Sequence, residues 1–341
     1  MTGPFDTAAR LALVALAVGA LGIAGSATAV AQEAQWTPPR TAAGRPDLQG
    51  IWANNRATPM ERPEQFGNKA TLTDEELAEL TNLIAQFRDS EQAGDLLGDR
   101  LIQQALGNST FQDFDEETGN YNAFWLVDRQ LDNRTSLIID PPNGRRPPQT
   151  EAARARASER TAARAGRGPS DGPEDRGVGD RCLHFASPSM GSGYNSYFQL
   201  LQTPTQVTII QEMGHIVRTI PLDGRPHLGA KVPQWIGNAR GRWEGDTLVV
   251  ETRNYDAKSR YNGGSPSLVL TERFSRVSPR VLRQEITLND PNTWTRPWTV
   301  ELLLDQSDEA IFEYACHEGN YAMPGILGGA RFEERAEAGG Q

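Results

Sequence analysis

The sequence has few cysteines, few histidines and no long apolar run after its N-terminal segment. Only 2 Cys occur in 341 residues, which excludes a small domain held together by many disulfides. No later segment approaches the ~18 consecutive apolar residues that a membrane-spanning helix needs. Acidic residues outnumber basic ones by 44 to 34, so the net charge of −10 provides no positive field for nucleic acid or anionic lipid. We therefore predict a folded acidic protein without nucleic-acid partners.

The N-terminal segment has the features of a signal peptide. Arg10 precedes an apolar run over 11–24, and the small residues Ala29 and Ala31 have the spacing that a signal peptidase reads. We predict that residues 1–31 are removed and that no membrane span remains after cleavage. The mature chain is then expected to be periplasmic or secreted.

The two cysteines are expected to pair. An even number of Cys in an exported chain favours a disulfide, which here would join Cys182 to Cys316 and close a long loop. A zinc site is disfavoured because neither Cys has a second one nearby.

The mature chain, 32–341, is predicted to form a single β-rich domain with three parts. An N-terminal arm and helical flank cover 32–135, an Arg- and Pro-rich linker covers 141–181, and a β-meander core covers 194–321.

Two helices are expected outside the core. Thr73 followed by Glu76 forms a capping box ahead of an apolar stripe at helical spacing, which predicts an amphipathic helix over 73–89. An arginine-rich helix is expected at about 150–165, most simply as a solvated surface segment.

From residue 194 onward, apolar and polar residues alternate with a period of two, which is typical of strands. The alternation predicts eight strands near 196–202, 206–213, 215–222, 246–252, 267–277, 280–289, 297–304 and 310–316. Shorter strands are expected at 50–52 and 136–140. Hairpin-length connections without helices predict an antiparallel meander that closes into a barrel or a curved sheet, because closure removes exposed edges. The one long connection, 223–240, would cross an end of that barrel.

Several predicted strands carry a single polar residue on an otherwise apolar face. These residues are Arg218, Glu272, Gln284, Glu313 and Glu212. Glu212 shares its face with Thr208 and Ile210. Isolated buried charges are costly, so these groups should meet one another, a ligand or trapped water. Two interpretations remain open: a rim or cross-strand ion pair such as Arg218 with Glu272, or a polar cluster that orients a small molecule.

Three of the four histidines lie near other reactive side chains in the sequence. A histidine paired with a carboxylate can perform acid–base catalysis without a cofactor. The candidate catalytic residues are His215, His227, His317, Glu212 and Glu318, and the candidate substrate-binding residues are Arg218, Glu272, Gln284 and Glu313. Alternatively, the three histidines converge on a metal ion or are hydrogen-bonded structural residues. No dense ligand spacing is present, so neither a metal nor a cofactor is predicted.

The sequence lacks a phosphate-binding glycine loop, a dinucleotide fingerprint and a nucleophile elbow, which sets aside nucleotide-dependent and serine-hydrolase mechanisms. We predict an exported pocket protein that acts on a small organic molecule by lyase, isomerase or hydrolase chemistry. One alternative is a non-catalytic small-molecule-binding protein, and another is an interaction module of the cell envelope. A catalyst should place a histidine beside a carboxylate in a concave site, whereas an interaction module should expose a flat apolar patch.

Four sequence blocks resemble those of a large group of exported bacterial proteins. They are RPDLQGIW at 45–52, IPLDGRPH at 220–227, GRWEGDTLVVET at 241–252 and FEYACHEGNY at 312–321. The resemblance implies export and supplies no mechanism. The tripeptide Gly50-Ile51-Trp52 also resembles the Gly-any-Trp of the first lipocalin strand, which implies a lipocalin-like barrel.

Overall fold

The computed structural model describes residues 36–88, 102, 129–183, 185–191, 194–259 and 261–339. The predicted signal peptide, 1–31, lies outside the described residues. By its internal contacts the chain divides into two units, Met1–Thr37 and Pro38–Gln341, and the helices and strands of the described residues belong to the second. None of these helices is both long and apolar enough to cross a membrane.

The second unit is built mainly from β-strands. The strands are β1 (Gly50–Ala53), β2 (Ile138–Asp140), β3 (Tyr197–Gln202), β4 (Gln206–Gln211), β5 (Ile216–Pro221), β6 (Asn238–Glu244), β7 (Thr247–Arg253), β8 (Val269–Ser278), β9 (Val281–Asn289) and β10 (Trp298–Ser307). The described α-helices are α1 (Asp74–Arg88), α3 (Glu151–Ala162) and α4 (Ala322–Gly339). Short 3₁₀ turns include η4 (Met213–His215) and η5 (Tyr261–Gly263).

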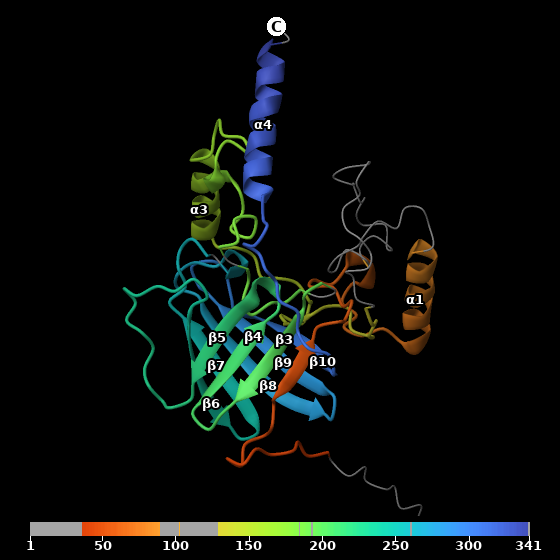
Figure 1. Ribbon diagram of the computed structural model, residues 1–341. Coiled ribbons are helices and arrows are strands. Elements are labelled where there is room, and N and C mark those ends of the chain that lie inside the picture. The colour runs from red at the N-terminus through yellow and green to blue at the C-terminus, as the bar shows by residue number, and fades with distance from the viewer. Residues whose placement is uncertain are drawn as a thin grey trace, which may run out of the picture. The chain divides into compact units, whose positions relative to one another are not determined.

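Nine of the strands form one antiparallel sheet that curves almost into a closed barrel (Figure 1). Their order is β5-β4-β3-β1-β10-β9-β8-β7-β6, and β2 pairs with β10 off this path. The short strand β1 lies between β3 and β10, so it joins the two parts of the meander. The predicted mainly β fold, with a lipocalin-like barrel and flanking helices, is confirmed.

The barrel has a seam between β5 and β6. Each neighbouring pair along the strand order is antiparallel, and an odd number of strands therefore leaves β5 and β6 running in the same direction. A parallel pair needs a connection that returns along the whole strand length, and residues 222–237 make this crossover (left in Figure 1). No backbone ladder joins these two fully described strands, so side chains close the seam.

The structure corrects two strand predictions. Residues 310–316 are not a strand, although their apolar residues alternate; Phe312 is 73% exposed and the segment pairs with no strand. Conversely, β6 was not predicted, because 223–240 was interpreted as a single long loop. The inward positions of β6 include Ala239 and Gly241. These residues are too small to produce a clear alternation of apolar and polar residues in the sequence.

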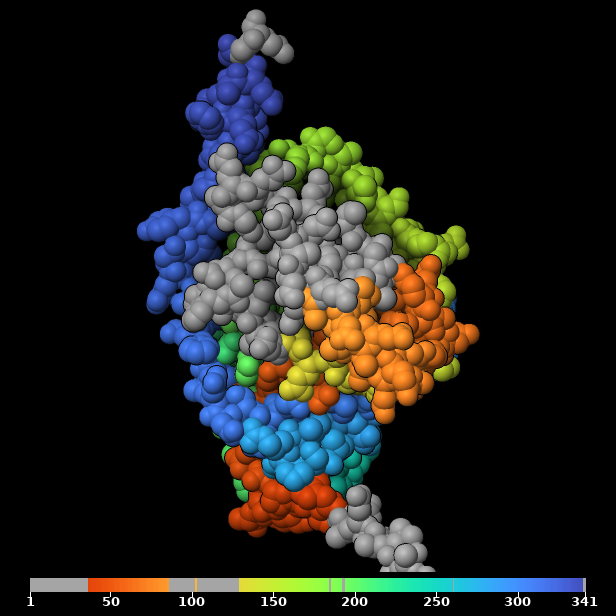
Figure 2. Space-filling model, turned by 90° about the vertical axis from the view of Figure 1, so that its right-hand side faces the viewer, coloured from red at the N-terminus to blue at the C-terminus, as the bar shows by residue number. Residues whose placement is uncertain are grey.

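The two predicted helices are present, as α1 and α3. The capping box begins α1: the Thr73 amide donates to the Glu76 carboxylate at 2.9 Å, and the Glu76 amide donates to Thr73 Oγ1 at 3.3 Å. Leu80 and Ile84 are buried in a small cluster separate from the barrel core, and Leu77 packs against it. Other side chains of α1, such as Glu79 and Thr81, are exposed on the surface of the molecule (Figure 2).

The main core fills the inside of the barrel. Alternate residues of each strand point inward, as the burial of every second position in β8, β9 and β10 shows. Trp52, Phe274 and Trp298 are the largest fully buried side chains. The guanidinium of Arg276 lies 5.4 Å from the centre of the Trp52 ring, where it covers the tryptophan at one end of the barrel.

Candidate functional site

Three of the predicted inward-facing polar residues meet inside the barrel. Arg218 on β5 and Glu272 on β8 are 3% and 0% exposed. Arg218 Nη1 donates to Glu272 Oε1 at 3.1 Å, and Nη2 donates to Glu272 Oε2. Gln284 Nε2 donates to the same Oε1 at 2.9 Å. Around the barrel, β5 is separated from β8 by β6 and β7 on the side of the seam and by five strands on the other side, so the ion pair crosses the barrel interior.

Burial controls the electrostatics of this cluster. Desolvation alone lowers the pKa of Arg218, but the charge and hydrogen bonds of Glu272 outweigh it, so the net direction is upward. Tyr255 and Tyr261 lie beside the pair with stacked rings 5.9 Å apart, and burial raises the pKa of both phenols. The cluster is thus an ion pair surrounded by neutral hydroxyls.

The cavity beside this ion pair is small. It measures about 20 Å³ and is lined in part by Arg218, Gln284 and Phe274, which leaves room for about one water molecule. The barrel plug, which we define as residues 186–191, covers it. Gln211 Nε2 donates to the Ala186 carbonyl at 3.1 Å, and the Tyr261 hydroxyl donates to the Pro188 carbonyl at 2.9 Å. Arg218, Glu272 and Gln284 therefore bond to one another inside the core, and this cavity does not fit an organic molecule.

Glu212 does not face into the barrel, contrary to the prediction. Thr208 and Ile210 lie on the outer face of β4, since Ile209 and Gln211 are buried on the inner one, and Glu212 follows the strand with helical φ and ψ of −62° and −52°. Glu212 is nevertheless buried, and its carboxylate accepts hydrogen bonds from Asn195 Nδ2 at 2.8 Å and from the amide of Phe312 at 2.9 Å.

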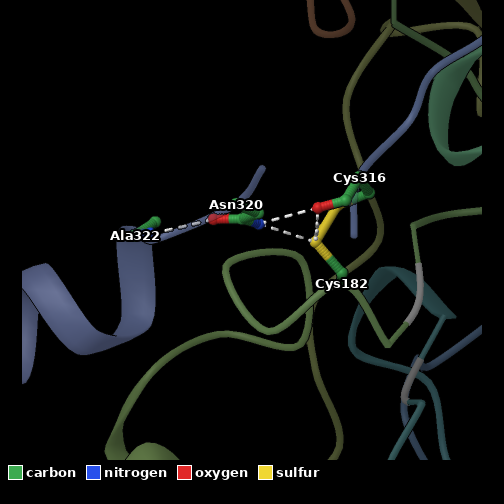
Figure 3. The surroundings of a disulfide bond; sticks show 4 residues. All are labelled: Cys182, Cys316, Asn320 and Ala322. Carbon is green, nitrogen blue, oxygen red and sulfur yellow. Dashed lines mark hydrogen bonds between the residues drawn. A yellow bond between two sulfur atoms is a disulfide. The ribbon is translucent and has the colours of Figure 1, made fainter. Parts of the chain in front are cut away.

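The amide of Phe312 belongs to the strap, which we define as residues 308–321, between β10 and α4. The strap is also fixed by the predicted disulfide, which joins Cys182 to Cys316 with their Cα atoms 5.7 Å apart. Asn320 Nδ2 donates to the Cys316 carbonyl at 2.8 Å, next to the disulfide (Figure 3). Glu212 and the disulfide thus hold a segment that has no strand partner.

The strap forms one wall of a pocket of about 450 Å³, which we name the strap pocket. The opposite walls come from 182–183 and 185, from the turn η4 and from the end of the crossover loop. The lining residues are Cys182, Leu183, Phe185, Gly214, His215, Ile216, Trp235, Ile236, Glu313, Tyr314, Ala315, Cys316, His317 and Glu318. Four of the predicted site residues therefore line one concave surface: His215, His317, Glu313 and Glu318.

The backbone at this pocket adopts uncommon conformations. His215 and Cys182 both have φ of +50°, and the other non-glycine residues with positive φ in the described part of the chain are asparagines. Gly214 has φ of +70°, and a Cβ atom there would lie 2.4 Å from the Phe185 ring. Strained conformations of this kind cluster at ligand sites and active sites, which directs attention to this pocket.

His227 lies away from the other two histidines, so the three do not converge. Its Nε2 atom is 3.2 Å from Glu251 Oε1, and its Nδ1 atom is 3.3 Å from Asn238 Oδ1, on the outer side of β6 and β7. Within the described ranges, no group of three or more His, Cys, Asp or Glu residues could hold a metal ion. The converging-histidine alternative therefore finds no support in the described residues.

The aromatic walls of the strap pocket were not identified from the sequence. Phe185, Trp235 and Tyr314 come from three separate segments, and the rings of Phe185 and Tyr314 pack edge to face with centroids 5.5 Å apart. No periodic pattern links these residues, so only the disulfide, which brings 182 and 316 together, could have indicated their proximity.

This chain matches no protein-family model, no curated protein and no solved structure. Its resemblance to a group of exported bacterial proteins therefore remains a sequence-based expectation. In the structure, the blocks at 45–52, 241–252 and 312–321 contribute to β1, to the β6–β7 hairpin and to the strap.

Proposed function

We propose that this chain is an exported protein that binds a small organic molecule in the strap pocket. The observation that carries the proposal is the makeup of the pocket, in which aromatic and aliphatic walls surround two imidazoles and two carboxylates. Its volume of about 450 Å³ falls in the range typical of small-molecule sites. The Cys182–Cys316 disulfide supports export to an oxidising compartment.

A filled-pocket variant tests this proposal. Ala315→Trp places a large ring on the strap pocket from an exposed position, whereas Thr219→Trp adds the same ring to the exposed outer face of β5. Small aromatic compounds screened by saturation-transfer NMR against the oxidised full chain should bind the wild type and Thr219→Trp and lose binding to Ala315→Trp. Equal binding to all three proteins would refute the proposal.

Acid–base catalysis on the bound molecule is the second candidate, and it is favoured by the presence of His215 and His317 in one pocket. Within the described residues, the histidine hydrogen-bonded to a carboxylate is His227, which lies elsewhere. A substrate would therefore have to complete the site, as apo geometry permits. Compounds that bind should then be converted to products detectable by mass spectrometry, and His317→Gln should slow conversion by about 10²-fold. Recovery of every bound compound unchanged would leave binding as the function.

A further inference from the structure

The charge of the strap pocket is of one sign. Glu313 and Glu318 contribute carboxylates, and none of its described lining residues is Lys or Arg. The chain as a whole carries a formal charge of −10. An anionic ligand would approach an acidic protein and then meet two carboxylates without a basic partner, whereas a cation would be attracted at both stages.

The walls of the pocket add a second interaction that favours a cation. Phe185, Trp235 and Tyr314 all line it, and Trp235 is 40% exposed. The face of an aromatic ring is electronegative, so ammonium groups bind to it, and tryptophan is the strongest partner. The hydrocarbon part of an amine would contact the same rings and the neighbouring Ile216 and Ile236.

The two histidines fit an ammonium group as well. An imidazole ring in its neutral form has one nitrogen that accepts a hydrogen bond from an N–H donor, and two such rings, His215 and His317, line the pocket. The carboxylates of Glu313 and Glu318 can only accept hydrogen bonds, and the Tyr314 hydroxyl can also accept one from a primary amine.

We infer that the strap pocket selects an organic cation, an aryl- or alkyl-ammonium compound, over a neutral or anionic molecule of the same size. This inference rests on the proposed function, because it specifies the class of ligand for that pocket. Attraction between exposed charges is modest in water, so the preference is expected to be about tenfold between a cation and an anion of equal size.

Three probes with the same ring and similar length test the inference: 2-phenylethylammonium, 2-phenylethanol and phenylacetate. Their dissociation constants are measured by calorimetry at low salt on the oxidised full chain. The cation should bind about tenfold more tightly than phenylacetate, with the alcohol between them. In Glu313→Gln/Glu318→Gln, the preference for the cation over phenylacetate should fall from about tenfold to about twofold, because the aromatic rings still favour the cation.

The matched control is Glu333→Gln/Glu337→Gln on α4, which removes the same charge from a surface outside the pocket. It should keep the preference for the cation. The inference is overturned if phenylacetate binds as tightly as the cation, or if the pocket variant keeps the full tenfold preference. If none of the three probes binds, or if Ala315→Trp binds them all unchanged, the proposed function itself is wrong and the inference falls with it.

Discussion

The Arg218–Glu272 pair illustrates how a single residue can matter to the whole barrel. Two opposite charges are removed from water and aligned with two hydrogen bonds, and Gln284 donates a third to the carboxylate. Such a pair adds little net stability over apolar residues of the same volume, yet losing one partner leaves a buried charge without compensation.

We expect Glu272→Gln to destabilise the protein by about 3–5 kcal/mol, because it leaves the Arg218 charge buried and unpaired. Urea unfolding followed by circular dichroism measures this change. Glu285→Gln is the matched control, since Glu285 lies at an outward position of β9, and it should change stability by less than about 0.5 kcal/mol. The double variant Arg218→Met/Glu272→Leu should recover most of the loss. Equal stability of Glu272→Gln and Glu285→Gln would contradict the role given to the pair.

The alternation of apolar and polar residues correctly predicted which side chains point into the barrel on three strands, and it gave the wrong result for Glu212. Arg218, Glu272 and Gln284 lie well inside regular strands, where a period of two fixes the side of the sheet. Glu212 follows the last residue of β4, and its burial comes from the strap, about 100 residues later in the chain, so no local pattern contains it. Opposite charge alone suggested that Arg218 pairs with Glu272. The sequence did not show that β5 and β8 face each other across the barrel, which is what brings the two side chains together.

At the level of the strands, the seam depends on the close approach of the β6 backbone at Gly241 to side chains at the end of β5. A Cβ atom on Gly241 of β6 would lie 2.6 Å from Leu222 Cδ2 and 2.9 Å from Ile220 Cγ2, both at or just past the end of β5. Glycine therefore allows the two parallel strands to come together without a backbone ladder between them.

We expect Gly241→Val to destabilise the barrel by about 2 kcal/mol, because overpacking a filled core forces neighbouring side chains and backbone to move. Chemical denaturation gives the magnitude, and hydrogen exchange should show faster opening of β5 and β6 than of β8 and β9. Gly229→Val is the control: Gly229 lies in the crossover loop, and a Cβ atom there would have no neighbour within 4 Å. If both variants have the same stability, the seam does not depend on Gly241.

The sequence predicted the strands in which large apolar residues alternate regularly with polar ones, and it missed β6, where this alternation is weak. β8 and β9 carry large apolar residues at most inward positions, whereas β6 carries Ala239 and Gly241 there and arginines on its outer face. The segment 310–316 has the opposite property, since it alternates in sequence but is fixed by a disulfide and by Glu212 instead of by strand pairing. Closure with nine strands follows from the pairing of β1 with β3 and β10, which no local signal reports.

For the molecule as a whole, one covalent bond connects segments that are far apart in the sequence. The disulfide spans 134 residues and attaches the strap to the region before the barrel plug. Cross-linking a long loop stabilises a protein by restricting its unfolded chain, by about 3–5 kcal/mol for a loop of this length.

We expect the variant Cys182→Ser/Cys316→Ser to unfold at a temperature about 10 °C lower than the wild type. Its far-ultraviolet circular dichroism should be unchanged, because neither cysteine belongs to a strand. Binding of 2-phenylethylammonium should be weaker than in the wild type even below the new unfolding temperature, because the strap keeps its hydrogen bond to Glu212 but loses its covalent link. Ala315→Ser, on the same wall, serves as the control for the added hydroxyl. An unchanged melting temperature in the double variant would show that the strap does not stabilise the fold.

The odd number of strands also determines how this barrel responds to force. Pulling β5 away from β6 separates only side chains, whereas dividing the sheet at any other place must break a row of backbone hydrogen bonds together. The barrel can therefore widen or narrow at the seam, like a split ring, while the backbone hydrogen bonds between all other neighbouring strands stay intact. Under mechanical tension, this line is where the ring opens first.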